Sequence, residues 1–443
     1  MRIKQIIAGI LFLPAISGFA QNVNFSADSL SLSDVIEQVL NNYPEIIKAQ
    51  KNIKIAEAGV NLAKTAYFPE IDVRGNYTHI GPVSSFDLSV LGLGIIQMYP
   101  TDNVAISLNL NQLIYDFGRT AKNIEMQRGS KTFNELALEN IKQEISLAVA
   151  SNYFSIAFLQ QAIKIKDEEI SVLKEHLNFV NKKAETGSAT QYEVLSTKVR
   201  ISAIENQRTD LESALAIQIS RLNSFLGNPQ NQDLPLKYEL FEPQQIESFE
   251  LLSSMAFANR VDLKMAEEKR KTSESKLALV KTQNYPSLDF FASGGWKNGY
   301  IPELNTLRTN YIVGVGLKAP VFDSGRTKYS KIAANNEIEM NNQAIELTKR
   351  NIINGIVENK SNIEASLKKL QQSEMQLQQA RQAYQLAETS FRAGTITNLD
   401  LLDSYTALSD TKLTLYKAKI DYTVNYLKLR VGLGERIYSI NFR

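Results

Sequence analysis

The sequence is dominated by an internal duplication. The motif YDFGRT at residues 115–120 recurs as FDSGRT at residues 322–327. Two pairs of glycines keep the offset of this motif: Gly118 with Gly325, and Gly187 with Gly394. Pro69 and Pro286, which precede the motif, are separated by a larger offset. A length difference confined to one loop, with register kept on both sides, is typical of a duplicated fold, so we expect two similar halves.

Four segments alternate apolar and polar residues with a period of two, which predicts β-strands. They lie at about residues 70–80 and 103–115 in the first half and 287–297 and 309–321 in the second. Each has about the length of a tilted strand that crosses a bilayer. Two soluble hairpins are the alternative, but the aromatic residues near the strand ends favour a membrane interface. These residues are Tyr77, Trp296, Tyr300 and Tyr311.

Four strands are too few to close a membrane barrel, because an open sheet edge in lipid leaves backbone groups without hydrogen bonds. The barrel must therefore be shared between chains. Two copies would give about eight strands and a lumen filled by side chains, whereas three would give about twelve strands and room for a pore. We favour three copies.

A long run without proline follows each copy of the motif, at residues 120–183 and 327–392, and predicts a helix of about 100 Å. In the second run, apolar residues recur at strict sevens, which implies supercoiling against a neighbouring helix. These residues are Ile356, Ile363, Leu370, Leu377 and Tyr384. Glycine-containing turns follow at residues 186–190 and 393–397. Returning helices at residues 192–226 and 399–431 should complete two coiled-coil hairpins.

The halves are expected at residues 21–227 and 250–443. Residues 228–249 contain three prolines and few helix signals, and they predict a linker or a small belt of short strands. Residues 1–20 have the pattern of a cleavable secretory signal, with Arg2 and Lys4 before an apolar stretch too short to span a bilayer.

The composition excludes several classes of protein. The chain has no cysteine, which excludes disulfides and thiol metal sites, and a formal net charge of +2, which gives no indication of a nucleic-acid partner. His79 and His176 are its only histidines, and neither has a second ligand at metal spacing. We therefore expect neither a metal or cofactor site nor an enzyme.

The secretory signal, the duplication, the strand pair in each half and the two long hairpins together resemble the TolC family of outer-membrane export channels. The most specific matches are PVFDSGR at residues 320–326, similar to the family's joint between barrel and helix, and GTITNLDLLD at residues 394–403, similar to its second periplasmic tip. The resemblance covers essentially the whole mature chain. It implies a homotrimer with one shared barrel in outer-membrane lipid and a helical tunnel in the periplasm.

The resemblance also implies function and partners. Members of this family are passive channels that export small toxic compounds, drugs or unfolded proteins. Their tips meet a periplasmic adaptor protein and an inner-membrane transporter, which supplies the energy. In this chain the matching tip residues are Gly187, Ser188, Gly394 and Thr395.

The resemblance places acidic residues in the closed aperture, at positions that match Asp400 and Asp403. Three chains would form a cation-attracting ring whose mutual repulsion raises some pKa values. Ordinary helix-start acids are the alternative. Family gates are also tied by an aromatic hydroxyl and an arginine near the second tip to the acid of the first. The matching residues are Phe391, Ile396 and the acid Glu193. Phe391 has no hydroxyl and Ile396 has no charge, which leaves Arg392 as a substitute.

The repeated DxGR motif has a structural interpretation. Its aspartate can cap the long helix, its glycine permits a bend, and its arginine can reach carbonyls or acids of a neighbouring chain. The residues concerned are Asp116, Gly118, Arg119, Asp323, Gly325 and Arg326, with Pro320 before the second copy where the first has Leu113.

Two other functions remain open from the sequence. A periplasmic coiled-coil adaptor or scaffold without a barrel would also contain helical hairpins. A surface-binding protein would use the loop at residues 81–102, which carries an apolar segment at residues 90–96. A strand extension or a loop over the barrel mouth is the more ordinary interpretation of that loop.

Overall fold

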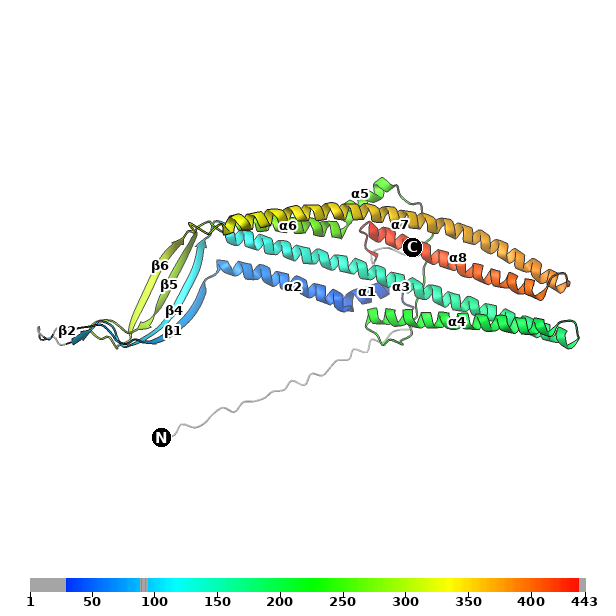
Figure 1. The fold of residues 1–443 in the computed structure, drawn as a ribbon, viewed down its shortest axis with the longest axis horizontal. Helices are drawn as coiled ribbons and strands as arrows, with labels where there is room; N and C mark the ends of the chain where they lie inside the picture. The colour runs from blue at the N-terminus through cyan, green and yellow to red at the C-terminus, as the bar shows by residue number, and fades with distance from the viewer. Residues whose placement is uncertain (1–28, 88, 90–91, 93–94, 438–443) are drawn as a thin grey trace, which may run out of the picture.

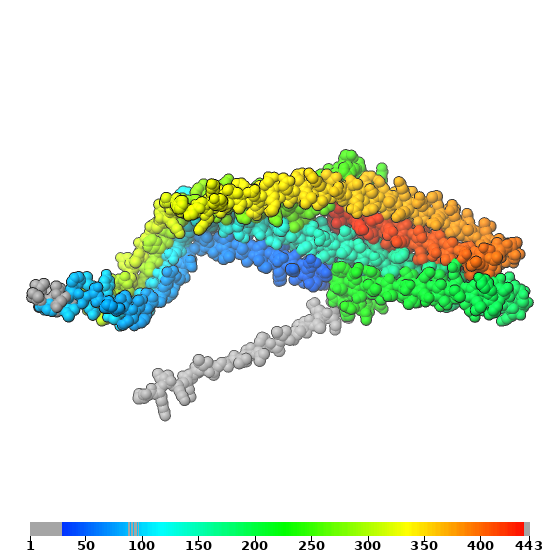
Figure 2. Space-filling model, viewed as in Figure 1, coloured from blue at the N-terminus to red at the C-terminus, as the bar shows by residue number. Residues whose placement is uncertain are grey.

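A computed structural model describes residues 29–87, 89, 92 and 95–437. The expected secretory signal, residues 1–20, lies outside the described residues. The molecule is long and narrow, with a curved sheet at one end and long helices running to the other (Figure 1). The space-filling view shows the same slender outline without a compact globular domain (Figure 2). None of the described helices is long and apolar enough to cross a membrane.

The four predicted strands form one antiparallel sheet in the order β1-β4-β5-β6. Its strands are β1 (Glu70–His79), β4 (Asp102–Tyr115), β5 (Ser287–Lys297) and β6 (Arg308–Lys318). The two halves of the chain join at the β4–β5 pairing, which leaves β1 and β6 at the edges. β6 stops before the predicted end at residue 321, because Pro320 has no backbone N–H to continue a ladder.

The strand register places the apolar residues of all four strands on one face. Val73 pairs with Leu108, Leu110 with Ala292, and Ala292 with Val313. The opposite face carries Asp72, Asn109 and Ser293, which are joined by hydrogen bonds from the Asn109 amide to Asp72 (2.9 Å) and from the Ser293 hydroxyl to Asn109 (2.8 Å). Val73, Val313 and Leu317 are 62–71% exposed in a single chain. An apolar face this open is suited to lipid.

The loop at residues 81–102 contains a short separate hairpin of β2 (Ser85–Asp87) and β3 (Ile95–Gln97). Figure 1 places this hairpin beyond the outer end of the four-stranded sheet. This position favours an extension beyond the strands over a loop folded across a barrel mouth, the two ordinary interpretations of this loop. The second half has no counterpart within the described residues, where β5 and β6 are joined without further strands.

In each half two α-helices precede the strand pair and one long helical hairpin follows it. The first half has α1 (Leu32–Asn42), α2 (Pro44–Lys64), the short helix η1 (Thr65–Tyr67), α3 (Arg119–Glu185) and α4 (Gln191–Leu226). The second has α5 (Phe249–Asn259), α6 (Val261–Lys281), α7 (Arg326–Arg392) and α8 (Asn398–Gly432). α3 and α7 are both 67 residues long. α2 and α6 run alongside the parts of these long helices nearest the sheet. α4 and α8 run alongside the parts farthest from it (Figure 1).

Two apolar clusters hold the middle of the molecule together. One joins α1, α3 and α4 around the fully buried Val149 and Phe154, and it also includes Ile420 and Leu427 of α8. The other joins α5, α7 and α8 around the predicted heptad residues Ile356 and Ile363. Further along α7, Leu377 and Tyr384 are only half-buried, so the heptad packing weakens toward the tip.

The segment between the halves is a linker. Between α4 and α5 the described chain forms no strand, and its one ladder contact is an isolated parallel bridge between Leu30 and Leu236. The alternative of a belt of short strands is therefore wrong. Pro229, Pro235 and Pro243 account for this, because proline cannot donate to a ladder.

Candidate functional site

The two DxGR motifs adopt the same backbone conformation. Phe117 and Ser324 have φ of 55° and 53°, and the glycines that follow them, Gly118 and Gly325, have φ of 89° and 80°. Two successive residues in the left-handed region turn the chain sharply, and glycine is favoured there because it has no side chain to clash. The motif thus turns the chain directly from the end of β4 into α3, and from the segment after β6 into α7.

The aspartates cap the long helices, as the sequence predicts. One oxygen of Asp116 accepts the Gly118 N–H (3.1 Å) and the other accepts the Thr120 N–H (2.7 Å). Asp323 accepts the equivalent N–H groups of Gly325 (3.0 Å) and Thr327 (2.9 Å). These bonds pair N–H groups that otherwise have no partner at a helix start.

Within one chain, Arg119 contacts backbone carbonyls at the end of α6. Its guanidinium donates to the carbonyls of Thr282, Gln283 and Tyr285 in the same chain, at 3.4, 3.4 and 2.8 Å. These carbonyls follow the end of α6, where backbone acceptors lack helical partners and attract a cation. Asn284, which lies between Gln283 and Tyr285, donates from its side-chain amide to Asp323 (3.1 Å). One segment therefore contacts the joints of both halves.

The hydrogen bonds at the second joint lower the pKa of Asp323 below its ordinary value of 3.8. The hydroxyl and the N–H of Thr327 contribute most, followed by the Asn284 amide. A carboxylate with a lowered folded-state pKa stabilises the fold above its unfolded pKa, and this contribution disappears as the pH falls through the folded value.

We expect Asp323→Asn to lower the thermal stability of the assembled protein at neutral pH. The difference in melting temperature from wild type should shrink as the pH falls below about 4, because the unfolded wild-type chain then takes up a proton that the folded carboxylate does not. Thermal melts monitored by circular dichroism across this range test it. Asp421→Asn removes an exposed acid of α8 and is the control. A stability difference that does not change with pH would contradict this role of the charge.

The two hairpin tips also repeat each other. Gly187 and Gly394 both have φ of 74° and end α3 and α7. The residues that follow them, Ser188 and Thr395, close the turns by donating backbone N–H groups to Lys183 (2.7 Å) and Ser390 (2.9 Å). All four residues predicted to dock an adaptor therefore lie at the far end of the molecule, where they are open to solvent.

Glu193 and Asp400 occupy matching positions in these tips. Each carboxylate accepts the backbone N–H of the threonine three residues earlier, Thr190 (3.2 Å) and Thr397 (2.9 Å), whose side chain caps the helix in return. The hydroxyl and N–H of Thr397 lower the pKa of Asp400 below its ordinary value. Within one chain both residues act as helix-start acids.

The predicted gate residues have separate partners within one chain. The Phe391 ring packs against His176 and Phe179, with ring centroids 5.3 and 6.2 Å apart. Arg392 forms an ion pair with Glu388 of its own helix (2.6 Å). Neither contacts Glu193, whose carboxylate caps α4. The structure thus does not bring Phe391, Arg392 and Glu193 together.

A different set of polar contacts joins the two hairpins near the tips. Asn398, the first residue of α8, is 3% exposed, bonds to the His176 ring of α3 and donates to the Thr197 hydroxyl of α4 (3.2 Å). Asp403 forms an ion pair with Arg200 of α4. We call these two contacts the tip bridge. Sequence reasoning identified Asp403 but missed its partner and the whole Asn398 contact.

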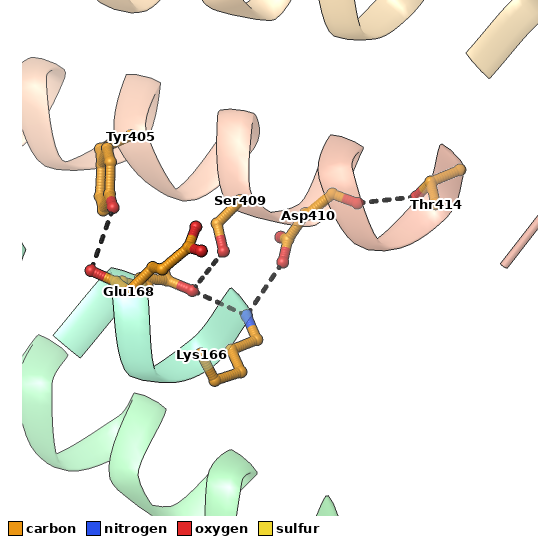
Figure 3. Close-up of polar contacts among 7 residues, drawn as sticks. Lys166, Glu168, Tyr405, Ser409, Asp410 and Thr414 are labelled. Carbon is orange, nitrogen blue, oxygen red and sulfur yellow. Dashed lines mark hydrogen bonds and ion pairs between the residues drawn. The ribbon is translucent and has the colours of Figure 1, made fainter. Parts of the chain in front are cut away.

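Closer to the middle, α3 and α8 are joined by a second polar set. Lys166 Nζ lies 2.9 Å from Glu169 and 3.3 Å from Asp410, and the Ser409 hydroxyl donates to Glu169 (2.6 Å). Lys412 adds an ion pair with Glu168 (3.1 Å). Figure 3 shows Lys166, Ser409 and Asp410 between the two helices. Charged residues beside Ile165 and Ile170, within an otherwise apolar helix face, were the available sequence signal.

Comparison with known proteins agrees with this geometry. The family model described as outer membrane efflux protein matches residues 35–228 and 252–435. The chain is 22% identical over 415 residues to the outer membrane protein TolC of Vibrio cholerae, covering 91% of this chain and 90% of that protein. It is 23% identical over 340 residues to the alkaline protease secretion protein AprF of Pseudomonas aeruginosa, covering 75% and 70%.

Among solved structures, the fold is similar to the outer membrane protein VceC of Vibrio cholerae. The TM-score is 0.74 at 18% sequence identity, covering 91% of this chain and 96% of that one. The two segments of the family match fall on the two halves of the duplication and together span most of the chain. The chain therefore belongs to the outer membrane efflux protein family, and it is an export channel of the outer membrane whose helical part lies in the periplasm.

Proposed function

We propose that three copies of this chain form the channel, each supplying four strands to one barrel and two hairpins to one tunnel. The free edges of β1 and β6 support this, because an edge strand in lipid must find a partner. Three copies give about twelve strands, which enclose a water-filled lumen. Two copies give about eight strands, whose lumen is filled by side chains. The polar sheet face around Asp72, Asn109 and Ser293 would then line that lumen.

The same observations disfavour a barrel-free adaptor or scaffold. Such a protein would expose the continuous apolar face of β1, β4, β5 and β6 to water. A large exposed apolar patch usually indicates a site that contacts a membrane or another protein. Surface binding through residues 81–102 has no separate support, since the described part of this loop is a short separate hairpin beyond the end of the four-stranded sheet.

We further propose that the tips dock a periplasmic adaptor protein and an inner-membrane transporter. Gly187, Ser188, Gly394 and Thr395 lie at the solvent-exposed end farthest from the sheet, which is where a partner rooted in the opposite membrane would meet the tunnel. The chain itself would be passive, with energy supplied by the transporter. Small toxic compounds or proteins are the proposed cargo classes.

In a trimer the second tips would bring Asp400 and Asp403 of three chains toward one axis. Repulsion between such carboxylates raises their pKa values, opposite to the effect of Thr397 within one chain. The ring would also attract multivalent cations, which would then obstruct the opening.

Purified trimers in a planar lipid bilayer test this proposal. We expect a small current that is reduced by a multivalent cation such as hexaamminecobalt, added on the side of the tips. Asp400→Asn should weaken the block about tenfold or more, because it removes three charges from the proposed ring. Asp421→Asn, on α8 away from the tip, is the matched control. Equal block in wild type and Asp400→Asn would contradict a ring at this position.

A further inference from the structure

The contact between α3 and α8, which we call the hairpin seam, changes character along its length. Toward the sheet, Phe154 and Ala157 of α3 share an apolar cluster with Ile420 and Leu427 of α8. Toward the tip, Ile170 and Leu173 share a smaller one with Leu402 and Tyr405. The two clusters are separate. Between them lie Lys166, Glu169 and Ser409, which are joined by hydrogen bonds; Figure 3 labels Lys166 and Ser409.

The charges at this level are withdrawn from water. The side chain of Lys166 is 4% exposed and that of Glu169 is 0% exposed. Ser409 is also buried, whereas Asp410 is 61% exposed at the rim. Glu169 therefore depends on Lys166 and Ser409 to replace its hydration.

That replacement is incomplete. Both neighbours bond to the same oxygen of Glu169, Oε2, at 2.9 and 2.6 Å. The other oxygen, Oε1, is buried and has no hydrogen-bond partner among the described residues. A buried carboxylate oxygen without a partner opposes the closed contact, because it would gain hydrogen bonds in water.

A hollow that opens to solvent lies on one side of this ion pair. This hollow of about 360 Å³ is lined by Lys166 and Asp410 together with Gln207 and Asp210 of α4. A small separation of α8 from α3 would connect this hollow to Glu169. The apolar cluster toward the sheet would not need to break, because its residues begin about two turns away along α3.

We propose that Lys166 and Glu169 form a release point, a buried ion pair that makes the tip half of the hairpin seam easy to separate. Separation hydrates both charges and the unpaired Oε1, so opening recovers hydration free energy that the closed contact gives up. An apolar contact of the same shape would gain no hydration free energy on separation, so it would stay closed. This inference rests on the proposed function for its biological meaning, but it concerns an equilibrium between two hairpin arrangements that is measurable without any current.

The proposal predicts opposite effects of single and paired substitutions. Glu169→Met leaves Lys166 buried with only the more distant Asp410, so the closed seam is weakened and the separated arrangement is more populated. Lys166→Met/Glu169→Met removes both charges at similar volume. Replacing a buried ion pair by apolar residues is commonly neutral or stabilising, so the separated arrangement should become about tenfold rarer than in wild type.

Distances between two spin labels, measured by pulsed electron paramagnetic resonance on the full-length protein, provide the test. The chain has no cysteine, so Leu195→Cys on α4 and Leu399→Cys on α8, both exposed, accept spin labels at only these positions. We expect the long-distance population to rise in Glu169→Met and to fall below wild type in the double variant. Bilayer current should follow the same order.

Two results would overturn the release point. A double variant that populates the long distance as much as Glu169→Met would show that the pair only holds the seam closed. A double variant equal to wild type would show that the pair has no influence on the equilibrium. If a methionine variant fails to assemble, Glu169→Gln, which leaves Lys166 charged, is compared with Lys166→Gln/Glu169→Gln, which removes both charges. Distances that shift as predicted without any current would contradict the channel rather than the release point.

Discussion

Replacing Gly295 by alanine is expected to abolish the assembled protein. Gly295 lies in β5 opposite Ser107 of β4, in the pairing that joins the two halves of the chain. A Cβ atom at Gly295 would lie 2.0 Å from the Ile106 carbonyl oxygen and 2.7 Å from the Ser107 Cα. These are backbone atoms of a neighbouring strand, which cannot rotate away. The strands must therefore part, at about 3 kcal/mol or more per chain.

The neighbouring glycine gives a matched control. A Cβ atom at Gly294 would meet nothing closer than the Asn310 carbonyl oxygen at 4.0 Å, which is ordinary contact. Gly294→Ala should therefore assemble like wild type. Heat-resistant oligomers on denaturing gels, prepared from outer-membrane fractions, distinguish the two variants. Normal oligomer yield from Gly295→Ala would show that the β4–β5 pairing differs from that described.

The second large effect is expected at the tip bridge. Asn398→Ala removes the buried side chain that bonds to both His176 and Thr197, at about 1–3 kcal/mol, although Thr197 keeps its donation to the Glu193 carbonyl (2.8 Å). The loss falls on the contact between hairpins and not on the fold of either hairpin. We therefore expect the proportion of open tips to rise about tenfold, seen as a larger bilayer current.

Gln191 is the internal control for this prediction. It is the first residue of α4, as Asn398 is of α8, but it is exposed. Gln191→Ala should leave the current unchanged. Equal currents from Asn398→Ala and wild type, in trimers of equal yield, would mean that the tip bridge does not restrain the opening.

The sequence predicts the elements of this fold well because its strongest signals are local. Period-two alternation in residues such as Ile71 and Val73 defines strands, and runs without proline define α3 and α7. Because the halves are duplicated, a feature recognised in one half is expected at the matching position of the other. The joint at Asp116 therefore predicts the joint at Asp323. The capping role of both aspartates follows from their position relative to the next threonine.

The contacts between elements were less predictable. Which helix faces Asn398 or Lys166 depends on how α8 is rotated against α3, and the heptad pattern on α7 does not specify this. The contacts of Arg119 within its own chain were not foreseen, because nothing local indicates that residues 282–285 return to its side. A side chain such as Glu193 satisfies the sequence pattern of a gate acid and of a helix cap equally well.

Single-channel recording of the purified full-length protein in a planar lipid bilayer tests the central claim most directly. The claim is that several copies of this chain enclose one continuous water-filled path, narrowed at the hairpin tips. We predict a small, steady current from wild-type trimers and a several-fold larger current from Asn398→Ala. The absence of current from pure, heat-resistant trimers of both proteins would contradict it.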